Sequence, residues 1–167
     1  MVPPFETRTT ALALCAFAVQ CGAYTLRDDD RLRIGASLSN LFWMLAALGL
    51  HDLAGAAISA LGCARGFVAV RAQGHARANP LLYGGFALLF AVLICVFAWK
   101  DAATPIAAAA GGLNIFASFC LQAAALRWGV LASTLLFAVY WACHAAPLQL
   151  IGALTAAGVL WWRARAI

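Results

Sequence analysis

Charged side chains are scarce in this sequence of 167 residues, where Asp, Glu, Lys and Arg together make up only 10% of the chain. A soluble globular domain usually carries about a quarter charged residues. Apolar residues reach 65%, which is more than a fold of this size can hide from water. The sequence therefore predicts that most of the chain lies in lipid, and it excludes a large enzyme with a separate catalytic domain.

Seven apolar runs are separated by short charged or proline-containing breaks. A helix needs about 20 residues to cross a bilayer, so the runs predict seven transmembrane helices. Their predicted bounds are 9–26, 32–50, 53–71, 81–99, 104–126, 129–146 and 148–163. We expect an all-α, polytopic membrane protein with one integral membrane domain over residues 1–167. The aspartates 28–30 fall in the first break and are expected to form a solvated turn.

The few basic residues give this topology an orientation. Seven spans place eight arginines on one side of the membrane and only Arg8 and Lys100 on the other. The eight are Arg27, Arg31, Arg33, Arg71, Arg77, Arg127, Arg163 and Arg165. Because cytoplasmic loops are enriched in Lys and Arg, we expect the amino terminus outside and the carboxyl terminus in the cytoplasm. Basic residues that follow loops do not indicate nucleic-acid binding.

The two halves of the chain resemble each other. Aligning Gly55 with Gly152 also sets Gln20 opposite Gln122, if the charged loop after the first helix is counted as an insertion. Three helices reverse the direction of the chain, so a linker helix is needed before the unit can repeat in parallel. The sequence thus predicts a 3+1+3 arrangement with a first repeat at 9–71, a linker helix at 81–99 and a second repeat at 104–163.

This arrangement resembles the SWEET and PQ-loop superfamily of small-solute transporters, and more closely the YgjV-type bacterial inner-membrane proteins. The resemblance rests on the block 37–71, with Arg65 and Arg71, and on the stretch Trp141–His144. It implies location in a bacterial inner membrane and a SWEET-like fold. Gly62 stands where family members tend to carry Asn, which weakens the case for sugar-type recognition.

Uncharged polar residues inside the spans are the first candidates for a solute site, because a polar group in lipid needs a partner or a cavity. Gln20, Gln122, Asn40 and Asn114 are of this kind. Each amide either bonds neighbouring helices together or lines a path for a solute.

Two ionisable residues complete the candidate site. Arg65 lies inside the third helix, where it either extends its side chain to the lipid headgroups or faces a cytoplasmic vestibule that attracts an anionic solute. His144 lies near the outer end of the sixth helix and is either a structural, hydrogen-bonded residue or a proton carrier.

Three classes of function remain to be weighed. The repeat and the paired glutamines favour a transporter or facilitator for a small solute. A non-transporting scaffold or sensor subunit is the alternative, and it predicts a sealed, packed interior. An enzyme is disfavoured because phosphate loops, dinucleotide fingerprints and CxxCH motifs are absent, and His75 is expected on the face opposite His51 and His144. We expect no cofactor and no metal site, and the sequence leaves open whether the chain works alone or as a homo-oligomer.

Overall fold

The structure is a computed structural model that describes residues 4–72, 78–98 and 102–166, with side chains for residues 8–72, 80–96 and 102–166. The described chain folds into seven α-helices, the fourth of which continues into a short π-helix, η1, and it contains no strand. The helices are α1 (Pro4–Thr25), α2 (Asp29–Gly49), α3 (Leu53–Ala72), α4 (Ala78–Leu93) with η1 (Ile94–Ala98), α5 (Thr104–Cys120), α6 (Ala123–Cys143) and α7 (Pro147–Arg165). The predicted all-α fold with seven helices is confirmed.

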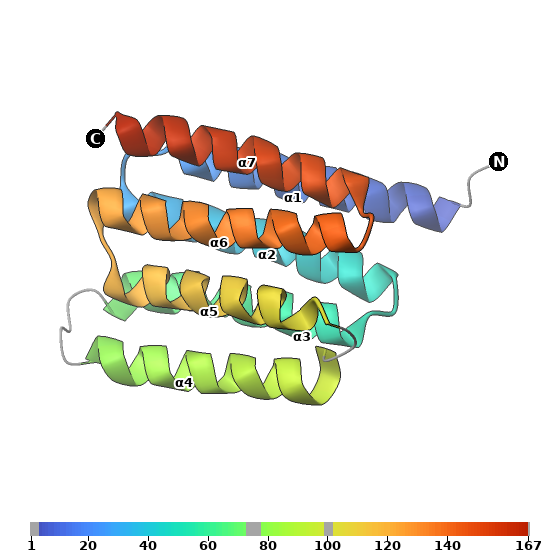
Figure 1. The fold of residues 1–167 in the computed structure, drawn as a ribbon, viewed down its shortest axis with the longest axis horizontal. Coiled ribbons are helices and arrows are strands. Elements are labelled where there is room, and N and C mark those ends of the chain that lie inside the picture. The colour runs from blue at the N-terminus through green and yellow to red at the C-terminus, as the bar shows by residue number, and fades with distance from the viewer. Residues whose placement is uncertain (1–3, 73–77, 99–101, 167) are drawn as a thin grey trace.

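The helices form two rows with their axes roughly along one direction (Figure 1). One row is α1, α2 and α3, and the other is α5, α6 and α7. The rows meet where α1 packs against α7 and where α3 packs against α5, and α4 covers one edge by contacting α3 and α5. Every described connection between neighbouring helices in a row is two or three residues long.

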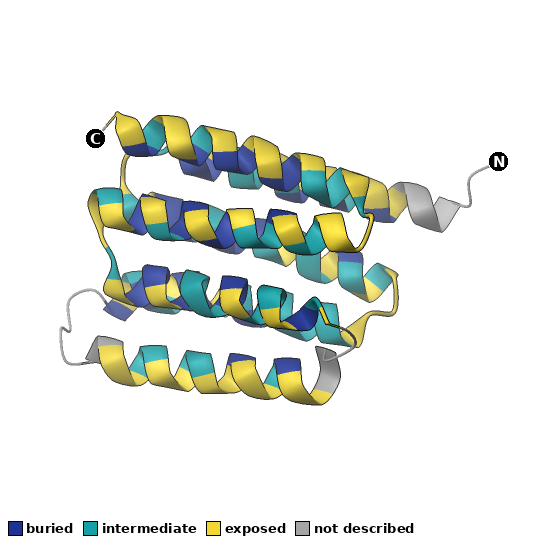
Figure 2. Cartoon of the chain, viewed as in Figure 1, coloured by how far each residue is buried: buried dark blue, intermediate teal, exposed yellow. Residues whose placement is uncertain are grey.

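Side-chain size is distributed as expected for helices in lipid. Small residues dominate the buried positions, whereas large apolar side chains such as Leu81, Leu88 and Trp162 are exposed, and exposed residues cover the outward surfaces of the helices (Figure 2). Without a hydrophobic driving force between helices, small residues that allow close approach hold membrane bundles together. Among the described helices, α2, α3 and α6 are long and apolar enough to cross a membrane, and shorter apolar stretches cover Pro80–Val96 and Thr104–Cys120.

Two serine hydrogen bonds join the first two helices of each row. The Ser39 hydroxyl on α2 donates to the Ala16 carbonyl on α1 at 2.9 Å. The Ser133 hydroxyl on α6 donates to the Ala110 carbonyl on α5 at 2.8 Å. Both bonds are buried, and both partners in the second bond follow their counterparts in the first by 94 residues. The α1–α2 and α5–α6 pairs are therefore held by the same contact at corresponding positions.

The same spacing of 94 residues relates other features of the two rows. It carries the bounds of α2, Asp29–Gly49, onto those of α6, and the first residue of α3 onto that of α7. The turn after α2 and the turn after α6 each place their middle residue, His51 and Ala145, in the left-handed region, with φ of 57° and 48°.

The close approach of α1 to α2, and of α5 to α6, depends on a glycine in each case. A Cβ atom added to Gly35 would overlap the Cβ of Ala23, and one added to Gly129 would lie 2.9 Å from the Cβ of Ala117. These contacts again correspond at a spacing of 94 residues. Only a residue without a side chain lets α2 and α6 lie this close to α1 and α5.

At the end of the bundle where α1 and α5 finish, two buried arginines cross between the rows. Arg127 on α6 donates from Nη2 to the carbonyl of Arg27 at 2.6 Å and to that of Leu26 at 3.1 Å. Arg33 on α2 donates from Nη2 to the carbonyl of Leu121 at 2.7 Å, and from Nε to that of Ser118 at 3.0 Å.

Each arginine thus binds the carbonyls at the end of the other row's first helix. We call Arg33, Arg127 and these bonds the arginine clamp. The carbonyl end of a helix carries a partial negative charge, so two guanidinium groups complement the ends of α1 and α5.

The aspartate run before α2 supports the arginine clamp and is not the solvated turn that the sequence suggested. Asp28 caps α2 by accepting from the backbone N–H of Arg31 at 2.8 Å. Asp29 pairs with Arg127 at 2.6 Å and accepts from the first backbone N–H of α6. Asp30 pairs with Arg33 at 3.3 Å.

The predicted break between the fifth and sixth helices at Arg127-Trp128 is wrong, because the structure ends α5 at Cys120 and begins α6 at Ala123. Arg127 is a fully buried residue of the first turns of α6. Its charge does not mark a loop, since a neighbouring carboxylate and the carbonyls of another helix end satisfy it in place of water.

Helix packing gives a matched pair of glycine variants as a prediction. Gly35→Ala is expected to destabilise the protein by about 1–3 kcal/mol, because overpacking forces the helices apart. Gly158→Ala on α7 adds the same atom where it meets nothing within 4 Å, so it should be neutral or stabilise by up to about 1 kcal/mol through helix propensity. Unfolding of both variants in detergent micelles measures the difference. Equal effects of the two changes would contradict the close α1–α2 contact.

Candidate solute cavity

A cavity of about 690 Å³ lies between the two rows of helices. Most of its lining residues lie at one end of the bundle, in the amino-terminal halves of α3, α5 and α7 and the carboxyl-terminal halves of α2 and α6. The lining also follows α1 as far as Tyr24 and includes Arg65 and Asn114 in the second halves of α3 and α5. The exposed residues Leu50 and Asp52, in the turn between α2 and α3, lie at its mouth. The cavity therefore opens at the end opposite to the arginine clamp. Its volume falls in the range of small-molecule sites, about 300–1,000 Å³.

Between the cavity and the arginine clamp, the interior of the bundle is filled by side chains. A cluster of buried residues fills the half that leads to the arginine clamp, and it draws on α1, α2, α5, α6 and α7. Its members include Ala23 and Leu32 from one row and Ala117 and Leu126 from the other, which again correspond at 94 residues. The described structure thus has one end open and one end closed.

Corresponding positions of the two rows face each other across the cavity. Ten pairs of lining residues are separated by 94 residues along the chain. They are Thr10/Thr104, Ala13/Ala107, Gln20/Asn114, Asn40/Thr134, Trp43/Phe137, Ala46/Tyr140, Ala47/Trp141, Ala54/Leu148, Gly55/Gln149 and Ser59/Ala153. Corresponding positions thus line the cavity from both sides, although the side chains differ in eight of the ten pairs.

Three of the four predicted amide residues line this cavity. Gln20 donates from its amide to the hydroxyl of Tyr24 at 2.9 Å, and Asn40 donates to the carbonyl of Ala36 on its own helix at 2.9 Å. The amide of Asn114 makes no hydrogen bond with the described part of the chain. Neither bonded amide bridges its helix to a neighbour, so the structure favours their role as cavity lining over a role as glue between helices.

Gln122 and His144 lie outside the cavity. Gln122 is exposed and caps the start of α6, two residues after α5 ends. The sequence placed it within a span because Arg127 was taken as the loop. His144 is exposed after the end of α6, where its Nδ1 lies 2.9 Å from the carbonyl of Tyr140, as in the structural role considered for it.

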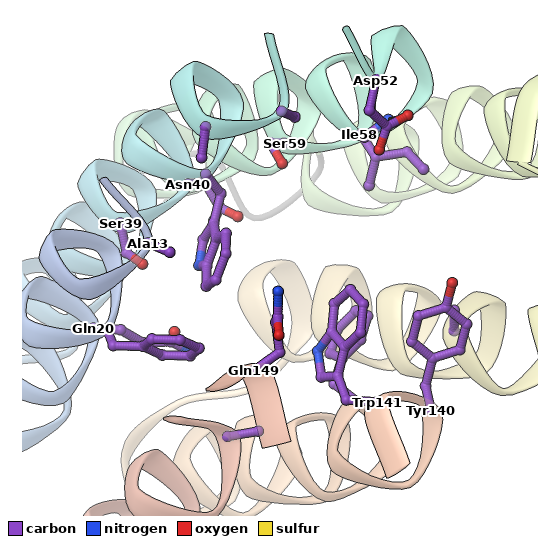
Figure 3. A pocket seen from close by; sticks show the side chains of 18 of the residues that line it. Ala13, Gln20, Ser39, Asn40, Asp52, Ile58, Ser59, Tyr140, Trp141 and Gln149 are labelled. Carbon is purple, nitrogen blue, oxygen red and sulfur yellow. Dashed lines mark hydrogen bonds between the residues drawn. The ribbon is translucent and has the colours of Figure 1, made fainter. Parts of the chain in front are cut away.

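The sequence did not identify the aromatic and amide residues of the opposite wall. Figure 3 shows Tyr140, Trp141 and Gln149 on one side of the cavity and Asn40 and Ser59 on the other. Gln149 is the third residue of α7 and could have been found from its position inside an apolar run. The tryptophan at 141 stood in the sequence as part of a family-like stretch, and no local signal distinguishes a tryptophan that faces a cavity from one that faces lipid.

Arg65 lies at the deep end of the cavity. Its side chain lines both the cavity and an adjoining recess of about 70 Å³, which share Asn40, Asn114 and Phe137. Arg65 is only 7% exposed, so it does not extend to the surface. The sequence also suggested that Arg65 faces a vestibule at the Arg71 end of α3. In the structure, the cavity that Arg65 faces opens at the other end of this helix.

Metal chemistry has no support in the described side chains, among which no group of three or more His, Cys, Asp or Glu residues could hold an ion. The six cysteines are all free. The cavity therefore offers amides, hydroxyls, aromatic rings, one guanidinium and, at its mouth, the carboxylate of Asp52 as its chemistry.

The comparison with protein families gives one match. The family model Imp-YgjV, described as a bacterial inner membrane protein, matches residues 9–158. All the cavity-lining residues, from Thr9 to Ala153, lie within this range. No curated protein and no solved structure matches the chain.

Cysteine labelling tests whether water fills the cavity. In a background without the six native cysteines, Ser59→Cys is expected to react with a small, charged thiol reagent, because Ser59 lines the cavity. Ser133→Cys is the control, since Ser133 is fully buried between helices and does not line the cavity. We expect labelling at 59 to be at least about tenfold faster than at 133, measured by mass spectrometry. Equal protection of both positions would mean that the cavity is closed to solvent.

Proposed function

The chain belongs to the Imp-YgjV family of bacterial inner membrane proteins, and from that premise we propose that it is a transporter or facilitator for a small solute. The observation that carries the proposal is a cavity of small-molecule size in the bundle interior, open at one end and closed at the other. Small-solute sites of membrane transporters lie between repeated helical units near the middle of the bilayer. A cavity between two rows of helices has this position.

We propose that α1–α3 and α5–α7 are two parallel three-helix units and that α4 is the linker between them. The serine bonds, the glycine contacts and the turns after α2 and α6 support a spacing of 94 residues between the units. The pairing of Gly55 with Gly152 differs from this spacing by three residues. A shift of three residues returns to nearly the same face of a helix, so apolar and small positions still matched in the shifted alignment.

The spacing of 94 residues also changes the partner of Gln20. Gln20 corresponds to Asn114 and not to Gln122, and both amides line the cavity. We therefore keep the proposal that two corresponding amides face a common site, with Asn114 in place of Gln122 in the second unit.

The arginine clamp supports an alternating-access mechanism. It consists of two matched sets of bonds between the units, located at the closed end. Rocking of one unit against the other would break these bonds and open that end while the cavity mouth closes. The charged end faces the cytoplasm in this proposal, because most arginines lie there, and the mouth faces outward.

The non-transporting scaffold predicts a sealed interior, and the cavity counts against it. A scaffold gains nothing from an interior lined by amides and aromatic residues, since polar groups in a bundle are costly unless they are used. The cavity thus supports the transporter.

Accessibility of the cavity from the two membrane faces tests this mechanism. Ser59→Cys should react from the amino-terminal face, and the double variant Arg33→Gln/Arg127→Gln should raise its reaction from the opposite face several-fold by weakening the arginine clamp. Arg31→Gln is the matched control, because Arg31 is exposed at the same end and its side chain takes no part in the arginine clamp. Oriented vesicles with an impermeant thiol reagent on either side supply the measurement.

Uptake by proteoliposomes of a panel of sugars, amino acids and organic acids is the complementary test. Flux of at least one class above protein-free liposomes is expected. An absence of flux, together with no reaction from the clamp side in the double variant, would overturn the proposed function.

A further inference from the structure

Arg65 is a buried charge without a partner. No hydrogen bond or ion pair links it to any described residue, and its Nε atom is buried with no hydrogen-bond partner. The Nε of Arg127 in the arginine clamp is also buried without a partner, but the remaining guanidinium nitrogens of Arg33 and Arg127 bind carboxylates and carbonyls. A buried charge is costly unless it is paired, so an unpaired guanidinium that lines a cavity points to an anion that enters the cavity.

The acidic side chains that the structure describes offer Arg65 little negative charge. Asp28, Asp29 and Asp30 are engaged at the opposite end of the bundle. Asp52 lines the cavity but lies exposed at its mouth, where it accepts from the backbone N–H of Gly55 at 3.0 Å. Tyr24, whose hydroxyl binds the amide of Gln20, lines the same cavity as Arg65 and is uncharged.

Arg65 is one of the positions at which the two units differ in charge. Its counterpart at a spacing of 94 residues is Val159, a partly buried apolar residue that does not line the cavity. Arg65 therefore has no charged counterpart in the other unit, whereas Arg33 and Arg127 of the arginine clamp correspond to each other.

We propose that the cavity binds an organic monocarboxylate, with its carboxylate on the guanidinium of Arg65 and its apolar body between the aromatic walls. This inference rests on the proposed function and names its substrate class. A guanidinium presents a planar fork of donors that matches a carboxylate. One cation balances one negative charge, whereas a dianion would leave a charge uncompensated in a medium of low dielectric constant.

The walls match the apolar part of such a ligand. Trp43 packs edge-to-face on Phe17 with ring centroids 4.9 Å apart, and Trp141 packs on Tyr140 at 4.8 Å. All four rings line the cavity, two from each unit. Gln149 and Asn114 supply amides that make no hydrogen bond with described residues, so they remain to bind further polar atoms of the ligand.

Paired probes of equal shape test the proposal. Benzoate, phenylacetate, indole-3-acetate and butyrate are each compared with the corresponding amide, and phenyl phosphate serves as the dianion. Binding to the full chain in lipid nanodiscs is measured by calorimetry and by tryptophan fluorescence. We expect at least one carboxylate to bind about tenfold or more tightly than its amide and more tightly than phenyl phosphate.

Variants assign this preference to Arg65. Arg65→Gln should bring the ratio of carboxylate to amide affinity close to one, and Arg65→Lys should keep part of it, since a lysine keeps the charge but loses the fork. Arg71→Gln is the control, because Arg71 is exposed on the same helix and does not line the cavity. If Arg65→Gln does not fold, the ratio in the wild type and in Arg65→Lys decides the question.

The inference is overturned if no carboxylate in the panel binds better than its amide, if phenyl phosphate binds best, or if Arg65→Gln keeps the carboxylate preference. Its failure differs from failure of the proposed function. Uptake of a neutral solute without any preference for carboxylates would overturn the ligand class and keep the transporter. Carboxylate binding that depends on Arg65, without flux in proteoliposomes and without reaction from the clamp side in the double variant, would keep the ligand site and overturn the transporter.

Discussion

The binding of helix ends by buried arginines is the interaction on which the rest of this structure depends. The carbonyls at the end of a helix have no partners within the helix, and inside a bilayer water cannot supply them. Here α1 and α5 finish at the same end of the bundle, and Arg127 and Arg33 each bind the carbonyls of the other row. Arg163 on α7 also donates from Nε to the Thr25 carbonyl at the end of α1, at 2.7 Å. One end of the bundle is thereby closed by polar contacts between the rows.

Closure at that end leaves the available space at the other. The small residues along α1, α2, α5 and α6 let these helices approach closely within each row, and the cluster around Leu32 and Leu126 fills the space between rows near the arginine clamp. Toward the opposite end the lining residues become aromatic and polar and the rows separate around the cavity. The packing thus sets where a ligand enters as well as how the helices associate.

Composition and hydropathy were sufficient to predict the helical class, seven helices and most of their bounds, because a lipid solvent imposes long apolar runs. Arg127 shows where this reasoning fails. A charge inside an apolar run indicates a loop only if water must solvate it, and the partner of Arg127 is Asp29, which lies far away in sequence. The misplaced loop then put Gln122 inside a helix, whereas the structure places it before α6 and outside the cavity.

The candidate site was predictable in kind and only partly in detail. Polar residues in apolar runs are conspicuous, so Gln20, Asn40, Asn114 and Arg65 could be selected from the sequence alone, and all four line the cavity. The aromatic wall formed by Tyr140 and Trp141 could not, because an aromatic side chain is equally at home against lipid, in a core or in a cavity. Which of these surroundings it meets depends on helix rotation, which hydropathy does not determine.

Arginine has two different roles in this bundle, and the difference lies in what each guanidinium can reach. Arg33 and Arg127 lie where helices end, so carbonyls and carboxylates surround them. Arg65 lies in the middle of a helix, where the backbone carbonyls of its own and neighbouring helices are already used in helical hydrogen bonds. The same side chain is therefore a structural tie at a helix end and an open binding group in the interior. A buried arginine that faces a cavity and lacks a helix end in reach is, on this reasoning, the charge in the bundle that is available to a ligand.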